Sequence, residues 1–238
     1  MVLQKEMVGD IEVIHSPKDI QHKNFLILIP GGGKTIGASR FDMLQHKLLE
    51  HNIGSISINF AGVEGSVGTV SEDSLKNRID TTLTIAKWVE ENFAYEQLSL
   101  YGVSMGGYIA LGVQQVLKCN GKIILHTPAA YAQDAHDVQF TDQFTSILRT
   151  EQSWRDSYSF DWLQDIKNPV LLIIHSQDEI IPIEISNRYK NIVFKNTNSK
   201  VIEIEGAQHS IWTNDQDNTI FKAQIVSEII NLINIVSL

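Results

Sequence analysis

Residues 98–107 read Leu98-Ser-Leu-Tyr-Gly-Val-Ser-Met-Gly-Gly107. The stretch begins as an apolar run typical of a buried strand and continues into a helical pattern, with Gly102-x-Ser104-x-Gly106 at the change. A serine on such a sharp turn has strained backbone angles, and small residues two positions to either side let the turn close. The N-terminal N–H groups of the following helix favour negative charge beside the hydroxyl. The pattern therefore predicts that Ser104 is a nucleophile.

Short apolar runs alternate with segments of helical period on both sides of this turn. Strands that are apolar throughout and separated by helices indicate a mainly parallel sheet covered on both faces. We therefore expect an α/β fold in a single domain over residues 1–238, with two short strands at the N-terminus forming a β-hairpin. The expected parallel strands are Phe25–Ile29, Gly54–Phe60, Gln97–Tyr101, Lys122–His126, Val170–His175 and Val201–Ile204, and the hairpin strands are Val2–Met7 and Gly9–Ile14. The expected helices are Phe41–His51, Ser71–Phe93, Ser104–Lys118 and Ile225–Leu238.

Residues 127–168 break this alternation. They contain no strand pattern, and the segment is far longer than the roughly 2–6 residues of an ordinary connection in this fold class. We expect an inserted helical cap over one end of the sheet, and the alternative is a crossover helix with an irregular lead-in. The segment is rich in aromatic residues, namely Phe140, Phe144, Trp154, Tyr158, Phe160 and Trp162. Such residues line apolar pockets and also dominate cores, so Trp154 and Trp162 are candidates either for binding substrate or for packing the cap onto the body.

Composition excludes several classes of protein. The 19 basic and 28 acidic residues give a formal net charge of −9, which disfavours binding to nucleic acid. The single cysteine, Cys119, cannot form a disulfide framework or a cysteine-rich zinc site, so we expect no metal. The N-terminus lacks the pattern of a signal peptide, and no apolar run approaches the ~20 residues that cross a bilayer. These features predict a cytoplasmic protein that acts on a small molecule without a membrane partner, and they leave its oligomeric state open.

A serine hydroxyl needs a base to remove its proton, and that base needs an orienting acid. In the strand–turn–helix context the partners follow the serine in the order acid, then histidine. Asp178 lies nearer to the end of the strand Val170–His175 than its neighbour Glu179, which favours Asp178 as the acid. His209 is the only histidine after that loop and is therefore the candidate base. The earlier His126 and His175, at strand ends, are interpreted as structural.

The tetrahedral intermediate would need two N–H donors aimed at its oxyanion. One is expected from Met105, the residue after the serine, and the other from Gly32, with Gly33 as the alternative. The same loop ends in Gly33-Lys34-Thr35, like a phosphate-binding loop, but that motif needs a glycine where this chain has Leu28. We therefore expect no nucleotide and no other cofactor.

Taken together these motifs resemble the serine hydrolases of the α/β-hydrolase superfamily over nearly the whole chain. The resemblance implies Ser104, Asp178 and His209 as a catalytic triad and a cap inserted after the strand that ends at His126. Family members often carry histidine where Pro30 stands and Arg-Gly-His-Gly where this chain has Ala61-Gly-Val-Glu64. The matching segments are Leu28-Ile-Pro-Gly-Gly-Gly33, Ile58-Asn-Phe-Ala-Gly62 with Ser66 and Gly68, Tyr101-Gly-Val-Ser-Met-Gly-Gly107, Pro169-Val-Leu-Leu-Ile-Ile-His175 with Asp178 and Pro182, and Gly206-Ala-Gln-His209.

The expected activity is hydrolysis of a carboxylic ester or thioester through an acyl-enzyme. An aminopeptidase-like or amide hydrolase on the same triad is the alternative, because Asp134, Asp137 and Asp142 in the cap could bind a free amine or could simply be solvated. The rival from another class is a binding protein that keeps the fold without catalysis. Fold and triad alone leave the substrate undetermined.

Overall fold

The computed structural model describes residues 2–32, 37–196, 198–212 and 218–234. Its centre is a sheet of eight strands in the order β1-β2-β4-β3-β5-β6-β7-β8. Strands β3 to β8 are parallel, whereas β1 and β2 form an antiparallel hairpin that pairs with β4 through β2. This arrangement confirms the predicted fold class. The strands are β1 (Gln4–Val8), β2 (Ile11–His15), β3 (His22–Ile29), β4 (Ile53–Ile58), β5 (Tyr95–Val103), β6 (Ile123–His126), β7 (Val170–His175) and β8 (Lys200–Ile204).

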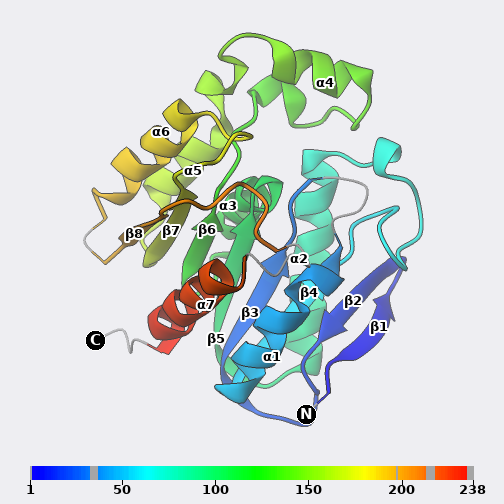
Figure 1. Ribbon diagram of the computed structural model, residues 1–238. Coiled ribbons are helices and arrows are strands. Elements are labelled where there is room, and N and C mark those ends of the chain that lie inside the picture. Colours follow the sequence, from blue (N-terminus) through cyan, green and yellow to red (C-terminus); the bar gives the residue numbers. More distant parts are fainter. Residues whose placement is uncertain (1, 33–36, 197, 213–217, 235–238) are drawn as a thin grey trace.

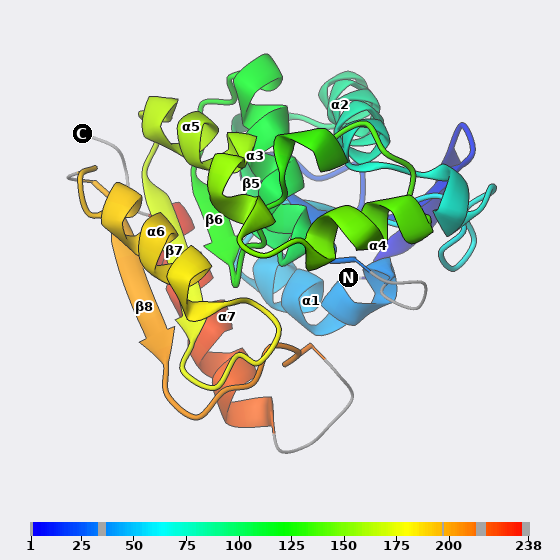
Figure 2. The same ribbon diagram turned by 90° about the horizontal axis from the view of Figure 1, so that it is seen from above.

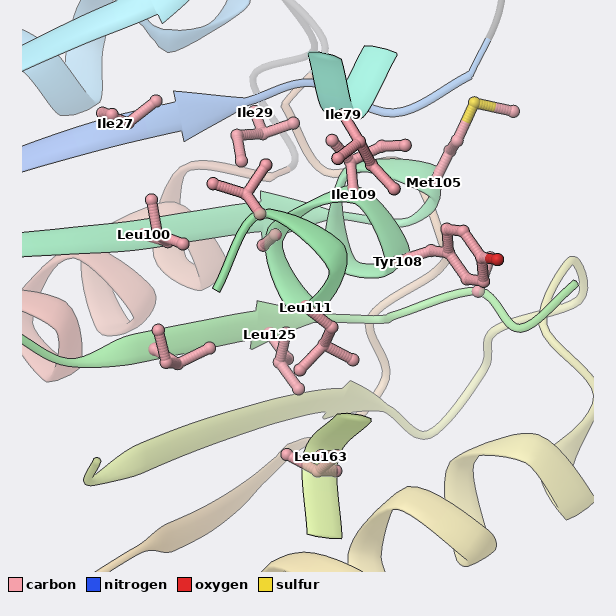
Figure 3. Close-up of a cluster of buried hydrophobic side chains, with 14 of the residues drawn as sticks. Ile27, Ile29, Ile79, Leu100, Met105, Tyr108, Ile109, Leu111, Leu125 and Leu163 are labelled. Carbon is pink, nitrogen blue, oxygen red and sulfur yellow. The ribbon is translucent and has the colours of Figure 1, made fainter. Parts of the chain in front are cut away.

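Helices cover both faces of the sheet (Figure 1). α1 (Asp42–Glu50) and α7 (Thr219–Asn234) lie on one face, and their apolar residues share a buried cluster with Leu26, Tyr101 and Ile173 of the sheet. The opposite face carries α2 (Leu75–Asn92), α3 (Met105–Leu117), α5 (Tyr158–Asp165) and α6 (Ile183–Val193). Figure 3 shows this second core, in which side chains of β3, β5 and β6 pack under α3. None of the helices within the described ranges is long and apolar enough to cross a membrane.

The predicted helices occur close to their expected bounds. Ser74 caps α2 by accepting a hydrogen bond from the N–H of Asn77 at 3.0 Å, so the helix begins after Ser74 rather than at Ser71. α7 begins at Thr219, earlier than expected, and the last four residues of the predicted helix lie outside the described residues. α6 was not predicted, although Ile185, Tyr189 and Val193 are buried at four-residue steps and provide a helical signal.

Residues 127–168 contain elements of both kinds that the sequence suggested. α4 (Asp142–Arg149) lies beyond the carboxyl end of the sheet, with the short helical turns η3 (Gln133–Ala135) and η4 (Ser153–Asp156) before and after it (Figure 2). Phe144 is the only buried residue of α4, so this helix is weakly attached to the body. α5, in contrast, packs against α3 and α6 on the face of the sheet, as a crossover helix does. The division into one domain with a cap remains our proposal.

Candidate active site

Ser104 lies at the turn between β5 and α3 with φ of 54° and ψ of −117°. This positive φ is costly for a residue with a side chain, and surrounding contacts hold it in place. The N–H of Ser104 donates to the carbonyl of His126 at 2.9 Å, and its own carbonyl accepts from Gly107 and Ala129 at 3.0 Å each. The strained turn predicted from the sequence is therefore present, and Ser104 lies among the residues that line a cavity.

The glycines around Ser104 are required by close backbone contacts. A Cβ on Gly106 would lie 2.1 Å from the carbonyl oxygen of Ile29 on the neighbouring strand β3. A Cβ on Gly102 would lie 2.1 Å from the carbonyl oxygen of Gly106 in the same turn. Both contacts are well inside van der Waals distance, so the turn can form only with glycine at these two positions. At Gly106 the obstacle to a side chain is the neighbouring strand, whereas at Gly102 it is the turn itself.

Two further loops bring His209 and Asp178 to Ser104. His209 Nε2 lies 3.1 Å from Ser104 Oγ, and His209 Nδ1 lies 2.7 Å from Asp178 Oδ2. The loop after β7 and the loop after β8 are joined by the N–H of Gln177, which donates to the carbonyl of Ala207 at 3.0 Å. A carboxylate can only accept, so Nδ1 of His209 carries the proton and Nε2 is free to accept from the hydroxyl of Ser104. The structure thus brings together the three residues selected from the sequence.

The carboxylate of Asp178 is held in one orientation. Its second oxygen, Oδ1, accepts hydrogen bonds from the N–H groups of Ile180 and Ile181 at 2.9 Å each. The Asp178 side chain is 6% exposed, and that burial by itself would raise the pKa of the carboxyl. The hydrogen bonds from His209 and from the N–H of Ile181 outweigh the burial, so the pKa of Asp178 is lowered and the group is ionised at neutral pH. Glu179 is exposed and makes no such contacts.

The candidate oxyanion donors, Gly32 and Met105, are neighbours in the structure. Gly32 lines the cavity, and Met105 is the first residue of α3. Within the described part of the chain, the N–H groups of Gly32 and Met105 donate to no other protein atom, which leaves them available to a ligand. A Cβ on Gly32 would lie 2.9 Å from Cε and 3.8 Å from Cβ of Met105, so the Met105 side chain packs against Gly32. Gly33, the alternative donor, lies outside the described residues.

The cavity at this site has a volume of about 360 Å³. Its lining combines the polar atoms of the site with apolar and aromatic side chains, as is usual for small-molecule sites. The described lining residues are Gly31, Gly32, Arg40, Phe41, Val103, Ser104, Tyr131, Ile180, His209, Ser210, Ile211 and Trp212. The described residues contain no group of three or more His, Cys, Asp or Glu side chains placed to hold a metal ion.

Comparison with known proteins assigns the family. The model of the family named alpha/beta hydrolase domain containing 18 matches residues 11–236, which is nearly the whole chain. The protein is a member of this family. No curated protein matches the sequence.

Solved structures show that this α/β-hydrolase shares its fold with several esterases. Est1E from Butyrivibrio proteoclasticus, solved with ferulic acid bound, is 15% identical, with a TM-score of 0.70 over 97% of this chain and 99% of that chain. The esterase Est2 from Thermogutta terrifontis is 12% identical, with a TM-score of 0.73 over 99% and 94%. An α/β serine hydrolase homologue from Coxiella burnetii is 21% identical, with a TM-score of 0.62 over 98% and 94%. At these identities the likeness concerns the fold alone.

Trp154 and Trp162 were candidates either for binding substrate or for packing residues 127–168 onto the body of this hydrolase. Neither Trp154 nor Trp162 is among the described residues that line the cavity. The Trp162 ring packs 5.1 Å from Tyr108 of α3 and stacks 5.5 Å from Tyr158, and Trp154 lies 6.2 Å from Phe160. Their positions do not support the predicted substrate-binding role and favour the alternative, that they attach the segment to the body.

Several cavity residues of the hydrolase were missed by the sequence analysis. From residues 127–168, the described residue that lines the cavity is Tyr131 rather than a tryptophan. Phe41 and Trp212, which lie far apart in the chain, line the same cavity. Trp212 follows His209 by three residues in the same loop, so a search for apolar residues beside the candidate base would have found it. No such sequence neighbour of a candidate catalytic residue pointed to Phe41, which was predicted only as the first residue of the helix Phe41–His51.

The two histidines interpreted as structural form a buried chain of hydrogen bonds that ends beside His209. His126 Nε2 lies 2.8 Å from His175 Nε2, and His175 Nδ1 lies 2.6 Å from the carbonyl oxygen of Gln208. On its other side, His126 Nδ1 lies 2.6 Å from the hydroxyl of Tyr101, which accepts from Trp212 Nε1 at 2.9 Å. The chain is therefore directly connected to the loop that carries the candidate base.

Only one set of proton positions satisfies this chain when both histidines are neutral. The carbonyl of Gln208 can only accept, so His175 carries its proton on Nδ1 and accepts at Nε2. His126 must then donate from Nε2 and accept at Nδ1 from the hydroxyl of Tyr101. Burial lowers the pKa of His175 to about 4 and the pKa of His126 well below its usual range, which keeps both rings neutral.

We expect this pair to make the hydrolase lose stability in mild acid. A folded-state pKa of about 4 for His175, against an ordinary value of about 6.5, means that the unfolded chain binds the proton first as the pH falls. The stabilisation is complete above about pH 6.5 and is lost progressively as the pH falls to about 4, by about 3 kcal/mol in the free energy of unfolding from His175 alone. Urea unfolding of the wild type and of His175→Gln, measured across this range, tests the expectation. The variant should be less stable at pH 7 and should show a shallower loss towards pH 4; equal slopes would contradict it.

Proposed function

We propose that the protein hydrolyses carboxylic esters or thioesters of small molecules through an acyl-enzyme. The observation that carries the proposal is the aligned set of contacts from Ser104 Oγ to His209 Nε2 at 3.1 Å and from His209 Nδ1 to Asp178 Oδ2 at 2.7 Å. Nucleophile, base and orienting acid are recognised by this geometry rather than by their order in the chain. The family assignment supports the hydrolase, and the positions of these three residues support their roles in it.

In the proposed reaction, Ser104 Oγ attacks the substrate carbonyl while its proton passes to His209 Nε2. The N–H groups of Gly32 and Met105 donate to the oxygen that becomes negative, and Asp178 stabilises the imidazolium that forms. Collapse of the tetrahedral intermediate breaks the bond to the alcohol or thiol, which takes the proton from His209. Water then attacks the acyl-enzyme with His209 again as base, and the carboxylic acid leaves with Ser104 restored.

Ester substrates are favoured over amides by two observations. Among proteins of the same fold, Est2 from Thermogutta terrifontis has been solved with propionate and with butyrate bound, and Est1E with ferulic acid bound. These ligands are carboxylic acids, which ester and amide hydrolysis both release, but Est2 is itself described as an esterase. Recognition of a free amine would want carboxylates at the cavity, but Asp134, Asp137 and Asp142 are exposed and are not among its described lining residues.

Active-site labelling tests the proposal against a binding protein of the same fold. We expect a fluorophosphonate to label the wild type once, at Ser104, and to leave a folded Ser104→Ala variant unlabelled, because the probe reacts with activated serines. Intact-mass and peptide mass spectrometry would identify the site. Absence of labelling in folded wild type would favour the binding protein. A panel of esters, thioesters and aminoacyl amides then separates the ester hydrolase from the amide alternative.

A further inference from the structure

Arg40 carries a positive charge at the wall of the active-site cavity. It belongs to the short helical turn η1 (Ala38–Phe41) that precedes α1, it is half-buried, and it lines the same cavity as Ser104 and His209. Of the described lining residues it is the only one with a permanent charge. Within the described ranges of the chain, its guanidinium makes no hydrogen bond, ion pair or ring contact. A guanidinium beside apolar walls is suited to an anionic group of the ligand.

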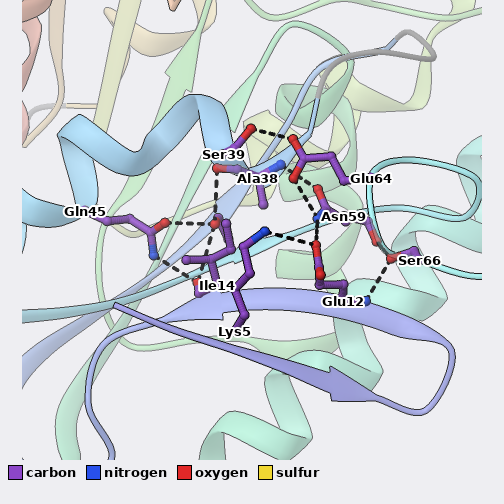
Figure 4. Close-up of polar contacts among 10 residues, drawn as sticks. Lys5, Glu12, Ile14, Ala38, Ser39, Gln45, Asn59, Glu64 and Ser66 are labelled. Atoms are coloured by element: carbon purple, nitrogen blue, oxygen red, sulfur yellow. Dashed lines mark hydrogen bonds and ion pairs between the residues drawn. The ribbon is translucent and has the colours of Figure 1, made fainter. Parts of the chain in front are cut away.

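The turn that carries Arg40 is anchored on both sides, and Figure 4 shows the polar contacts of Ala38 and Ser39 on the side before it. Before it in the chain, the N–H of Ala38 donates to Asn59 Oδ1 at 2.6 Å, and the hydroxyl of Ser39 donates to the carboxylate of Glu64. After it, Phe41 is buried, with its ring 5.8 Å from that of Tyr101. The backbone of Arg40 is therefore positioned by its neighbours, independently of any ligand.

Two carboxylates of this region, those of Glu64 and Asp178, already accept hydrogen bonds from other donors. Glu64 accepts from the hydroxyl of Ser39 and, through its other oxygen, from Asn59 Nδ2 at 3.1 Å. Asp178 accepts from His209 and from two backbone N–H groups. In a chain with a formal net charge of −9, Arg40 thus has no anionic partner among the described residues at the site where substrate would bind. The apolar walls beside it would strengthen the attraction to a negative charge relative to water.

We propose that Arg40 binds a carboxylate of the substrate, so that the preferred substrates are small esters that carry a negative charge. The inference rests on the proposed ester hydrolysis, but it concerns Arg40 rather than Ser104, Asp178 and His209, and the charged group of the ligand rather than its ester bond. Two placements of the carboxylate fit this chemistry, on the acyl side or on the alcohol side of the ester. The guanidinium would form two parallel hydrogen bonds with it, which a lysine cannot reproduce.

A ratio of specificity constants tests this contact. The acyl arm compares the para-nitrophenyl half-ester of adipic acid with para-nitrophenyl hexanoate, and the alcohol arm compares a hexanoyl ester of glycolic acid with the hexanoyl ester of ethanol. In the comparison that matches the true position of the carboxylate, we expect the ratio of kcat/KM for the charged ester to kcat/KM for the neutral ester to fall about 10- to 100-fold in Arg40→Gln. The ratio for Arg40→Lys should lie between those of the wild type and Arg40→Gln. Arg149→Gln, which changes an exposed arginine of α4 outside the described cavity lining, should keep the wild-type ratio.

An unchanged ratio in both arms for Arg40→Gln would overturn the inference while leaving ester hydrolysis intact. Wild type that hydrolyses none of these esters would instead overturn the proposed function. Arg40 can still be tested in that case, by calorimetric binding of the adipate half-ester to Ser104→Ala and to Ser104→Ala combined with Arg40→Gln. We expect Kd to be at least tenfold weaker in the double variant. Equal affinities, or no binding to either, would show that Arg40 does not bind the carboxylate.

Discussion

Ser104→Ala is expected to lower kcat by about 10⁴-fold or more while leaving the melting temperature close to that of the wild type. The substitution removes one hydroxyl oxygen from the cavity and keeps a Cβ on a backbone whose φ of 54° is set by the turn and not by the hydroxyl. Without Oγ no acyl-enzyme forms, and the residual rate comes only from substrate binding and the oxyanion donors. Steady-state kinetics on a para-nitrophenyl ester, together with a thermal melt, measures both quantities.

Ser146→Ala is the matched control for this experiment. Ser146 is exposed on α4 and is not among the described residues that line the cavity. Its substitution should change neither the rate nor the melting temperature. A folded Ser104→Ala protein with nearly full activity would show that another group is the nucleophile, and the assignment of all three residues would then be wrong.

Asp178→Asn is expected to lower kcat by about 10⁴-fold, with KM much less affected. An asparagine side chain can present its NH₂ to His209 Nδ1, which would then accept, so the ring proton would move to Nε2 and face Ser104 Oγ. In that tautomer His209 cannot accept the serine proton. The amide oxygen can still accept from the N–H groups of Ile180 and Ile181, so the loop should keep its conformation.

Glu179→Gln provides the comparison, because it makes the same chemical change one residue further along the chain. Glu179 is exposed and is not a described lining residue of the cavity, so its substitution should change kcat less than twofold. Kinetics of both variants on the same ester decides between the two carboxylates. A large loss in Glu179→Gln with little in Asp178→Asn would reverse the assignment of the acid.

Features encoded over short distances along the chain could be predicted from the sequence. The buried parallel strands appear as apolar runs, and β7 has the predicted bounds, Val170–His175. Gly102 and Gly106 indicated the turn at Ser104, because no other residue fits the close backbone contacts at these two positions. Asp178 and His209 could be proposed because each follows a parallel strand, and the carboxyl ends of parallel strands meet at one edge of the sheet. The expected order of serine, then acid, then histidine along the chain left few other candidates for the acid and the base.

The cavity and its surroundings depended on contacts that have no such local signal. Phe41, Tyr131 and Trp212 lie far apart in the chain and meet only because the sheet brings their loops to one edge. An aromatic residue has the same apolar character whether it lines a pocket or packs against a helix, which is why the sequence left both roles open for Trp162, which lies against Tyr108.

The sequence by itself determined the strands, four of the helices, the serine turn and the residues that meet at Ser104. Each of these follows from backbone sterics and from the period of apolar residues, which act over a few positions. The tertiary structure decided which charges are neutralised. Arg40 and Arg78 are the same residue type in the sequence, yet Arg78 is buried against Asp73 at 2.7 Å, whereas Arg40 at the cavity has no charged partner among the described residues. Whether a charge has a partner depends on the packing of distant segments, and local sequence does not encode it.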